Sequence, residues 1–271
     1  MSMNSSRNCV QLYIENKLGC TDLSKWSSYK SKLEQLTLNE EDELQLNKLV
    51  VSDATSYYIK AVISFSEAIS GLKKNRSSWS VVKFYYSVFY LIRADLLLED
   101  YFLVRCKGFY YSKVKNNEKI QKFQPSSIRG DHQLTTHFYN KLHREGKHID
   151  PLQDGEIDDC LPYLWLMSQR EKINYQSKDF EDPGIVECLQ KPAIYIREGR
   201  EKDLLSMYES AEDFIYCFDK DHACIAIPYC KIIETGRKLK NKHSVLEIPE
   251  HLFSHIKSIV NISSTYPLAF L

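Results

Sequence analysis

Apolar side chains recur at helical spacing through the first two thirds of the chain. Between residues 39 and 72 they repeat every three or four positions, which predicts a long helix with one buried face. The run TLNEED opens this segment, and Thr37 with Glu40 predicts a capping box at its start. The next segment, WSVVKFYYSVFYLIRADLLLE, is apolar on two faces from about Trp79 to Glu99. A helix of this kind is typical of the centre of a bundle.

The predicted central helix also carries charges within its apolar run. Lys83 and Arg93 must find partners or extend to solvent if they are buried, and Asp95 and Glu171 are the candidate counter-ions. We expect Ser77 or Ser78 to cap this helix. Its large side chains Trp79, Tyr86, Phe89 and Leu96 are expected in the core.

Other segments complete a mainly α prediction. Shorter helices are expected at residues 5–21, 132–143 and 158–176, and residues 105–130 read as a basic loop. After residue 184 the runs AIYIRE (193–198) and ACIAIPY (223–229) are of strand type, with helices expected at 201–218, 231–240 and 249–261. We therefore expect a helical domain over 1–184 and a small α or α+β region over 185–271.

Composition supports a folded, helix-rich chain. The 271 residues include 18 Tyr, 12 Phe and 3 Trp, but only 9 Gly and 8 Pro, which excludes a disordered chain and disfavours an all-β fold. Positive and negative side chains balance at 36 each. The first ten residues lack the apolar run of a signal peptide, and no stretch of 18 apolar residues occurs, so we expect a cytoplasmic protein without a membrane span.

The motifs of the common cofactor and metal sites are missing from the sequence. It contains no GxxxxGK[ST], GxGxxG, GxSxG or HExxH motif, so we expect no cofactor and no ATPase activity. Its eight cysteines are scattered without a CxxC pair, which favours reduced thiols. A metal site is the alternative, although the spacing fits no ordinary zinc pattern; its ligands would be Cys217, His222, Cys224 and Cys230.

Three segments in the middle of the chain share an order with a known superfamily. They are SSWSVVKFYYSVFYLIRADLLL, then RGDHQLTTHFYNKL, then SQREKINYQSKDF. Their order and spacing resemble the HEPN superfamily of helical bundles, and the W-x-x-x-K-x-Y-Y-S-x-F form also looks like YaaC-type bacterial proteins. The resemblance covers roughly residues 75–182. It implies a HEPN-like antiparallel bundle, with extra N-terminal helices and the C-terminal region added to it.

The resemblance places Arg170 at the position of a functional arginine. Nuclease members of the superfamily combine this arginine with a histidine four to six residues later, so that one stabilises phosphate charge and the other moves a proton. In this chain the later position holds Tyr175. Because a tyrosine with its ordinary pKa of about 10 is a poor base at neutral pH, we expect no catalysis. Arg170 and Tyr175 are then expected in a buried hydrogen-bond network that closes the bundle.

A local excess of positive charge lies between Arg105 and Lys147. This segment holds ten Lys or Arg and three acidic residues, interleaved with aromatics at 109–111 and 123. A basic loop with exposed aromatics can follow a phosphate backbone and stack bases. An acidic protein surface and a merely solvated loop are the alternatives. The candidate contact residues are Lys113, Lys115, Lys119, Lys122, Arg129, Lys141, Arg144 and Lys147.

Three functions follow from these observations. The first is a non-catalytic scaffold or regulatory subunit, which the resemblance places in bacterial multi-protein complexes, plausibly anti-phage defence, beside an ATPase and an effector nuclease. The second is a metal-independent endoribonuclease with a degenerate site. The third is a nucleic-acid-binding module that uses the segment 105–147. The partners expected are a larger protein or a second copy of the chain, with nucleic acid as an alternative.

Overall fold

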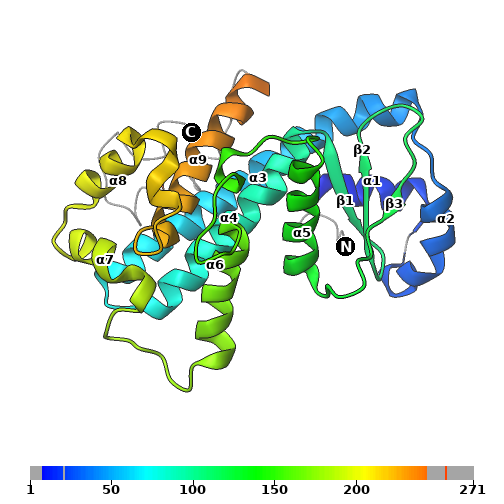
Figure 1. Ribbon diagram of the computed structural model, residues 1–271. Coiled ribbons are helices and arrows are strands. Elements are labelled where there is room, and N and C mark those ends of the chain that lie inside the picture. The colour runs from blue at the N-terminus through cyan, green and yellow to red at the C-terminus, as the bar shows by residue number, and fades with distance from the viewer. Residues whose placement is uncertain (1–7, 21, 243–253, 255–271) are drawn as a thin grey trace. The chain divides into compact units, whose positions relative to one another are not determined.

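The chain folds mainly into helices, as the computed structural model shows for residues 8–20, 22–242 and 254 (Figure 1). It divides into two compact units. Unit 1 comprises Met1–Tyr57 and Ile92–Lys141, and unit 2 comprises Tyr58–Leu91 and Leu142–Leu271. The mainly α fold class is confirmed, whereas the HEPN-like arrangement stays a prediction. The boundary expected at residue 184 falls within the second stretch of unit 2.

Unit 1 combines helices with a small antiparallel sheet. Its elements are α1 (Cys9–Lys17), a 3-10 helix (Leu23–Tyr29), α2 (Lys30–Gln35), the first part of α3 (Glu40–Lys73), the end of α4 (Ser77–Leu98), β1 (Tyr101–Arg105), β2 (Phe109–Lys113), β3 (Gln121–Lys122) and most of α5 (Asp131–Arg144). The strands pair in the order β1-β2-β3. Tyr101 lies opposite Lys113, and Tyr110 lies opposite Lys122.

Aromatic rings pack α5 against one face of the sheet. The ring of Phe138 on α5 contacts Tyr101, Phe109, Tyr111 and Phe123, with centroid distances between 4.4 and 6.3 Å. Alternate side chains of a strand point to opposite faces, so these residues share one face. The interleaved aromatics are therefore not the exposed stacking surface expected of a basic loop: Phe109 and Tyr110 are buried.

The regular elements of unit 2 are helices in the part of the chain that the structure describes. It contains the second part of α3, most of α4, α6 (Pro162–Glu171), a π-helix (Lys172–Gln176), α7 (Gln190–Arg197), α8 (Glu201–Ser210) and α9 (Ala223–Lys242), with 3-10 helices at Pro151–Gln153, Glu187–Leu189 and Glu212–Cys217. Phe65 of α3 packs edge-on against Phe84 of α4 at 5.4 Å, and lies 5.9 Å from Tyr229 of α9.

Small residues bring α3 and α4 close together within unit 2. The hydroxyl groups of Ser80 and Ser87 on α4 donate hydrogen bonds to the carbonyl oxygens of Ala68 and Ala61 on α3, at 2.8 and 2.9 Å. At Gly71 an added Cβ would lie 2.6 Å from the Ser80 oxygen. This contact explains a glycine within the last two turns of α3, where the sequence suggested only a helix end.

Several sequence predictions are wrong in detail. The strands expected at 193–198 and 223–229 are helical, in α7 and α9, and the expected loop at 105–130 contains β2, β3 and the last residue of β1. The helix start is capped by Asn39 and Asp42, each side chain accepting a hydrogen bond from the other residue's N–H, rather than by Thr37. Trp79 is exposed, whereas Phe89 and Leu96 are buried as expected.

The helix predicted at 249–261 lies outside the described residues except for residue 254. Among the helices that the structure describes, none combines the length and the apolar character needed to cross a bilayer.

Candidate functional site

The arginine singled out by the sequence lies at the end of α6. Pro162 occupies the first turn of this helix, where its missing N–H is tolerated, and Arg170 stands in the last turn. The chain then continues as a π-helix over Lys172–Gln176, which carries Tyr175. π-helical turns are rare and are found frequently at functional sites.

Three tyrosine rings surround the Arg170 guanidinium. Its Cζ atom lies 5.2 Å from the ring centroid of Tyr85, 5.9 Å from that of Tyr86 and 5.6 Å from that of Tyr175. A guanidinium within about 6 Å of a ring face is attracted by the ring quadrupole. We call these four residues the Arg170 cluster. Burial raises the pKa of the Tyr85 phenol, although the Arg170 charge opposes the rise.

The Arg170 side chain is nearly buried, but its polar contacts are weak. It is 12% exposed, one terminal nitrogen lies 3.5 Å from the Tyr175 hydroxyl, and another lies 4.0 Å from a Glu171 carboxylate oxygen. Its Nε atom is buried and makes no hydrogen bond among the described residues. Tyr175 itself is 73% exposed, so the expected buried network is replaced by an arginine held mainly between rings.

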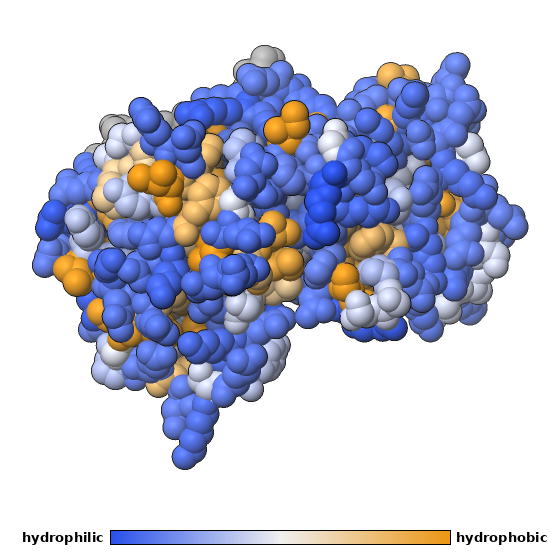
Figure 2. Space-filling view, in the orientation of Figure 1, coloured by the Kyte–Doolittle hydropathy of each residue, from blue (hydrophilic) through white to orange (hydrophobic). Residues whose placement is uncertain are grey.

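Two further exposed aromatic side chains belong to the same unit as this cluster. Trp79 and Phe180 are each 49% exposed and lie 5.6 Å apart between ring centroids. Trp79 is two helical turns from Tyr86 on α4, so both lie on one face of that helix. We call Trp79, Tyr175 and Phe180 the aromatic surface. The face shown in Figure 2 is mostly hydrophilic, with its hydrophobic residues in small separate patches.

The charged residues of α4 have partners other than those expected. The Lys83 ammonium pairs with Glu67 of α3 in unit 2. In unit 1, Arg93 lies 3.5 Å from Asp131 and 4.8 Å from the ring centroid of Tyr57. The ion-pair partners in the structure are thus Glu67 and Asp131, where the sequence suggested Asp95 and Glu171.

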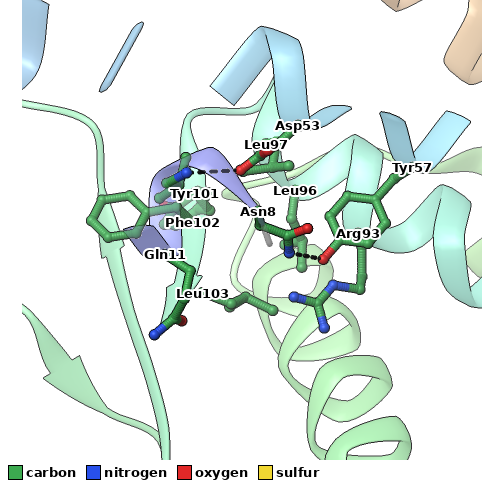
Figure 3. A pocket seen from close by; sticks show the side chains of 11 residues that line it. Asn8, Gln11, Asp53, Tyr57, Arg93, Leu96, Leu97, Tyr101, Phe102 and Leu103 are labelled. Carbon is green, nitrogen blue, oxygen red and sulfur yellow. Dashed lines mark hydrogen bonds between the residues drawn. The ribbon is translucent and has the colours of Figure 1, made fainter. Parts of the chain in front are cut away.

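A small cavity in unit 1 adjoins Arg93 (Figure 3). Its volume is about 20 Å³, which holds one water molecule. Asn8 donates a hydrogen bond to the Tyr57 hydroxyl, and the Asp53 carboxylate accepts two from the N–H groups that begin α1, at 2.8 and 2.9 Å. Burial raises the Asp53 pKa against these donors. These hydrogen bonds connect the start of α1 to α3, and the cavity is too small for a larger ligand.

The eight basic candidates do not share one unit. Lys113, Lys115, Lys119, Lys122, Arg129 and Lys141 belong to unit 1, whereas Arg144 and Lys147 belong to unit 2, and all eight are exposed. Within the sheet, Lys113 and Lys122 pair with Tyr101 and Tyr110, which point to opposite faces. Lys113 also lies 5.4 Å from the Tyr101 ring centroid. The structure therefore spreads these charges over several surfaces.

A buried ion-pair network in unit 2 was not predicted from the sequence. The Lys231 ammonium of α9 donates hydrogen bonds to Asp150 at 2.9 Å and to Glu234 at 3.1 Å. Asp150 also accepts from the Tyr163 hydroxyl at 2.6 Å and from the Leu152 N–H at 3.1 Å. The Lys231 and Asp150 side chains have no exposed surface. No local signal joins residues 81 positions apart.

The four residues of the metal alternative do not form a ligand cluster in the described part of the chain. The Nδ1 atom of His222 instead lies 3.0 Å from the Tyr208 hydroxyl.

Comparison with known proteins adds no assignment: no family model, curated protein or solved structure matches the chain.

Proposed function

We propose that this chain is a non-catalytic interaction subunit that binds a protein partner through the aromatic surface beside the Arg170 cluster. The observation that carries this proposal is the exposure of Tyr175 beside a nearly buried arginine, together with the exposed ring pair Trp79 and Phe180 in the same unit. Tryptophan, tyrosine and arginine are the side chains that dominate the binding energy of protein interfaces.

The chemistry of the site supports binding over catalysis. A nuclease of the resembled superfamily needs a proton-transferring histidine, and Tyr175 holds that position. The Arg170 guanidinium is already held between three rings, so less side-chain entropy is lost when a partner binds. The resemblance suggests an ATPase and an effector nuclease of a defence system as the first partners to test.

The experiment is co-purification of the tagged chain with its native partners, followed by affinity measurement. Tyr175→Ala combined with Trp79→Ala should weaken the association by about 30-fold, corresponding to about 2 kcal/mol for interface hot spots. Leu44→Ala is the matched control, because Leu44 is a 59% exposed apolar residue in unit 1. Unchanged affinity of the double variant, with normal folding by circular dichroism, would refute the proposed surface.

Arg170 also favours a second candidate, the degenerate endoribonuclease. Its terminal nitrogens make only long contacts, at 3.5 Å to Tyr175 and 4.0 Å to Glu171, and such nitrogens are able to bind a phosphate oxygen. Single-stranded and structured RNA should be incubated with the chain in EDTA. Cleavage that disappears in Arg170→Ala would establish the endoribonuclease and reject the non-catalytic proposal. RNA that stays intact would support the non-catalytic proposal.

A further inference from the structure

A polar cavity of about 180 Å³ opens in unit 2, and the proposed function does not use it. One water molecule needs about 10–15 Å³ of such space, so this cavity has room for a small organic solute. The cavity beside Arg93 in unit 1, at about 20 Å³, is much smaller. Size therefore makes the cavity in unit 2 the candidate for a ligand.

One wall of this cavity is a face of α6 and of the π-helix that continues it. Trp165, Gln169 and Lys172 line the cavity at spacings of four and three residues, which places them on one side of a helix. Trp165 is only 5% exposed, and its indole N–H makes no hydrogen bond with the described residues. Because a buried indole N–H usually has a partner, an occupant of the cavity that carries an acceptor would satisfy it.

Two ion pairs hold the neighbouring walls of the cavity. The Lys172 ammonium lies 3.6 Å from the Glu187 carboxylate, which belongs to the 3-10 helix Glu187–Leu189. The Asp221 carboxylate, just before α9, lies 2.5 Å from the ammonium of Lys191 on α7. Lys172, Glu187 and Asp221 are therefore charged lining residues that already have partners of opposite sign.

The other two charged lining residues, Asp158 and Lys220, form no ion pair among the described residues. Asp158 stands in a tight turn, in which it and Asp159 have positive φ angles of 49° and 59°. The backbones of Ile157 and Cys160 close this turn with hydrogen bonds of 2.9 and 3.0 Å, in the manner of a type I′ turn. The turn fixes the backbone position of one uncompensated carboxylate at the cavity, and Lys220 adds one uncompensated ammonium.

The mixture of charges decides which kind of ligand the cavity suits. Its lining contains three carboxylates and two ammonium groups. A phosphate or sulfate ion would approach the three carboxylates, and a bare cation would approach the two ammonium groups, so either one is opposed by part of the lining. A ligand that carries one ammonium and one carboxylate complements both of the uncompensated residues.

We infer that this cavity binds a free α-amino acid as a zwitterion, with its ammonium at Asp158 and its carboxylate at Lys220 and the Trp165 indole N–H. The Gln169 amide, one helical turn from Trp165, is a donor and an acceptor for the ligand's side chain. The inference goes beyond the proposed function, because no residue of the aromatic surface lines this cavity.

The test is titration of the purified full chain with each standard L-amino acid in turn, followed by calorimetry. At least one of them should bind in the millimolar range or tighter. The N-acetyl derivative of the tightest ligand lacks the ammonium, and its α-amide lacks the carboxylate. Each derivative should bind about tenfold or more weakly, because a charged hydrogen bond is lost.

Nuclear magnetic resonance of the nitrogen-15-labelled chain identifies the site. The chain has three tryptophans, so its indole N–H groups give three separate signals. The ligand should move the signal of Trp165, assigned as the one missing from Trp165→Phe, and leave the other two in place. Binding that moves a different indole signal and leaves that of Trp165 in place would reject this cavity as the site.

Charge-removing variants test the two anchoring residues. Asp158→Asn keeps a residue that type I′ turns favour but removes the carboxylate, and Lys220→Gln removes the ammonium. Each should weaken binding about tenfold or more. Asp159→Asn is the matched control, since Asp159 belongs to the same turn and does not line the cavity, and its affinity should equal that of the unmutated chain.

Three results would overturn the inference. The first is the absence of binding by every amino acid in the millimolar range. The second is equal affinity for the N-acetyl derivative or the α-amide, since the ligand would then not be recognised as a zwitterion. The third is an Asp158→Asn variant that folds, by circular dichroism, and binds as tightly as Asp159→Asn.

Discussion

The buried Lys231–Asp150 pair gives the sharpest test of how unit 2 is held together. Both side chains are inaccessible to solvent, and the Asp150 carboxylate also accepts hydrogen bonds from Tyr163 and Leu152. Replacing Lys231 by Met removes the positive charge while keeping most of the side-chain volume. The Asp150 carboxylate then stays in a low-dielectric interior without the ammonium group that lay 2.9 Å from it.

The expected loss follows from the cost of an uncompensated buried charge. Breaking a buried ion pair from one side lowers the free energy of unfolding by about 3–5 kcal/mol. For a chain of this size that corresponds to a fall in Tm of about 6–20 °C. The double variant Lys231→Met with Asp150→Leu should recover much of the loss, because apolar replacements of both partners are often neutral.

Urea unfolding at neutral pH, followed by circular dichroism, measures these changes. Lys191→Met is the matched control, since Lys191 is exposed and pairs with Asp221 at 2.5 Å on the surface; its midpoint should not move. A Lys231→Met loss of less than about 1 kcal/mol, the range of exposed pairs, would refute the argument from burial. A double variant no more stable than the single variant would refute the assignment of the loss to Asp150.

Three further predictions concern the core, a histidine and the basic residues. Phe89→Ala should lower the free energy of unfolding by about 3–5 kcal/mol, because Phe89 is buried on α4; a Tm change of less than a few degrees would place this helix outside the core. Burial lowers the His222 pKa from 6.5, so the unfolded chain binds a proton at this residue more readily than the folded chain. The free energy of unfolding should therefore fall as the pH drops below 6.5 towards the folded pKa. The His222→Gln variant should flatten this dependence in urea midpoints measured from pH 7.5 to 5.5. Changing Lys113, Lys115, Lys119 and Lys122 to Glu should weaken association with a partner, most of all at low salt, if the contact is electrostatic. Lys113 and Lys122 point to opposite faces of the sheet, so their single changes to Glu would identify the face in contact. Unchanged protein binding and unchanged gel-shift affinity would leave only a solvated surface.

The long helices with regular apolar spacing were predictable from the sequence. α3 and α4 lie close to the expected ranges, because several turns of regular spacing outweigh uncertainty at their ends. The strand predicted at 223–229 is wrong for a physical reason: an uninterrupted apolar run fits a buried strand and a buried helix equally well. In α9 the residues from Ala223 to Ile233 are all buried, so the run is the start of a helix enclosed on every side.

The sheet and the site show what sequence spacing leaves out. In β2 the pattern of FYYSK is compatible with a strand, but the surrounding lysines favoured a loop interpretation. At the candidate site, the order of Arg170 and Tyr175 was readable, whereas the enclosure of the guanidinium by Tyr85 and Tyr86 depends on α4 packing beside α6. The exposure of Trp79 likewise depends on where the neighbouring segments end, and the spacing of apolar residues along α4 gives no information about that.

The interleaving of the two units along the chain has a consequence for synthesis. Unit 1 takes Met1–Tyr57 and then Ile92–Lys141, so its sheet strands emerge from the ribosome only after 34 intervening residues of unit 2 have been made. Those residues belong to α3 and α4, whose apolar faces await α6 and α9 from the later part of the chain. The two units therefore do not mature as successive independent modules during translation. Any fragment ending between residues 58 and 141 exposes unfinished surfaces of both units, and a chain truncated at residue 184 would lack the α9 wall that encloses Phe65.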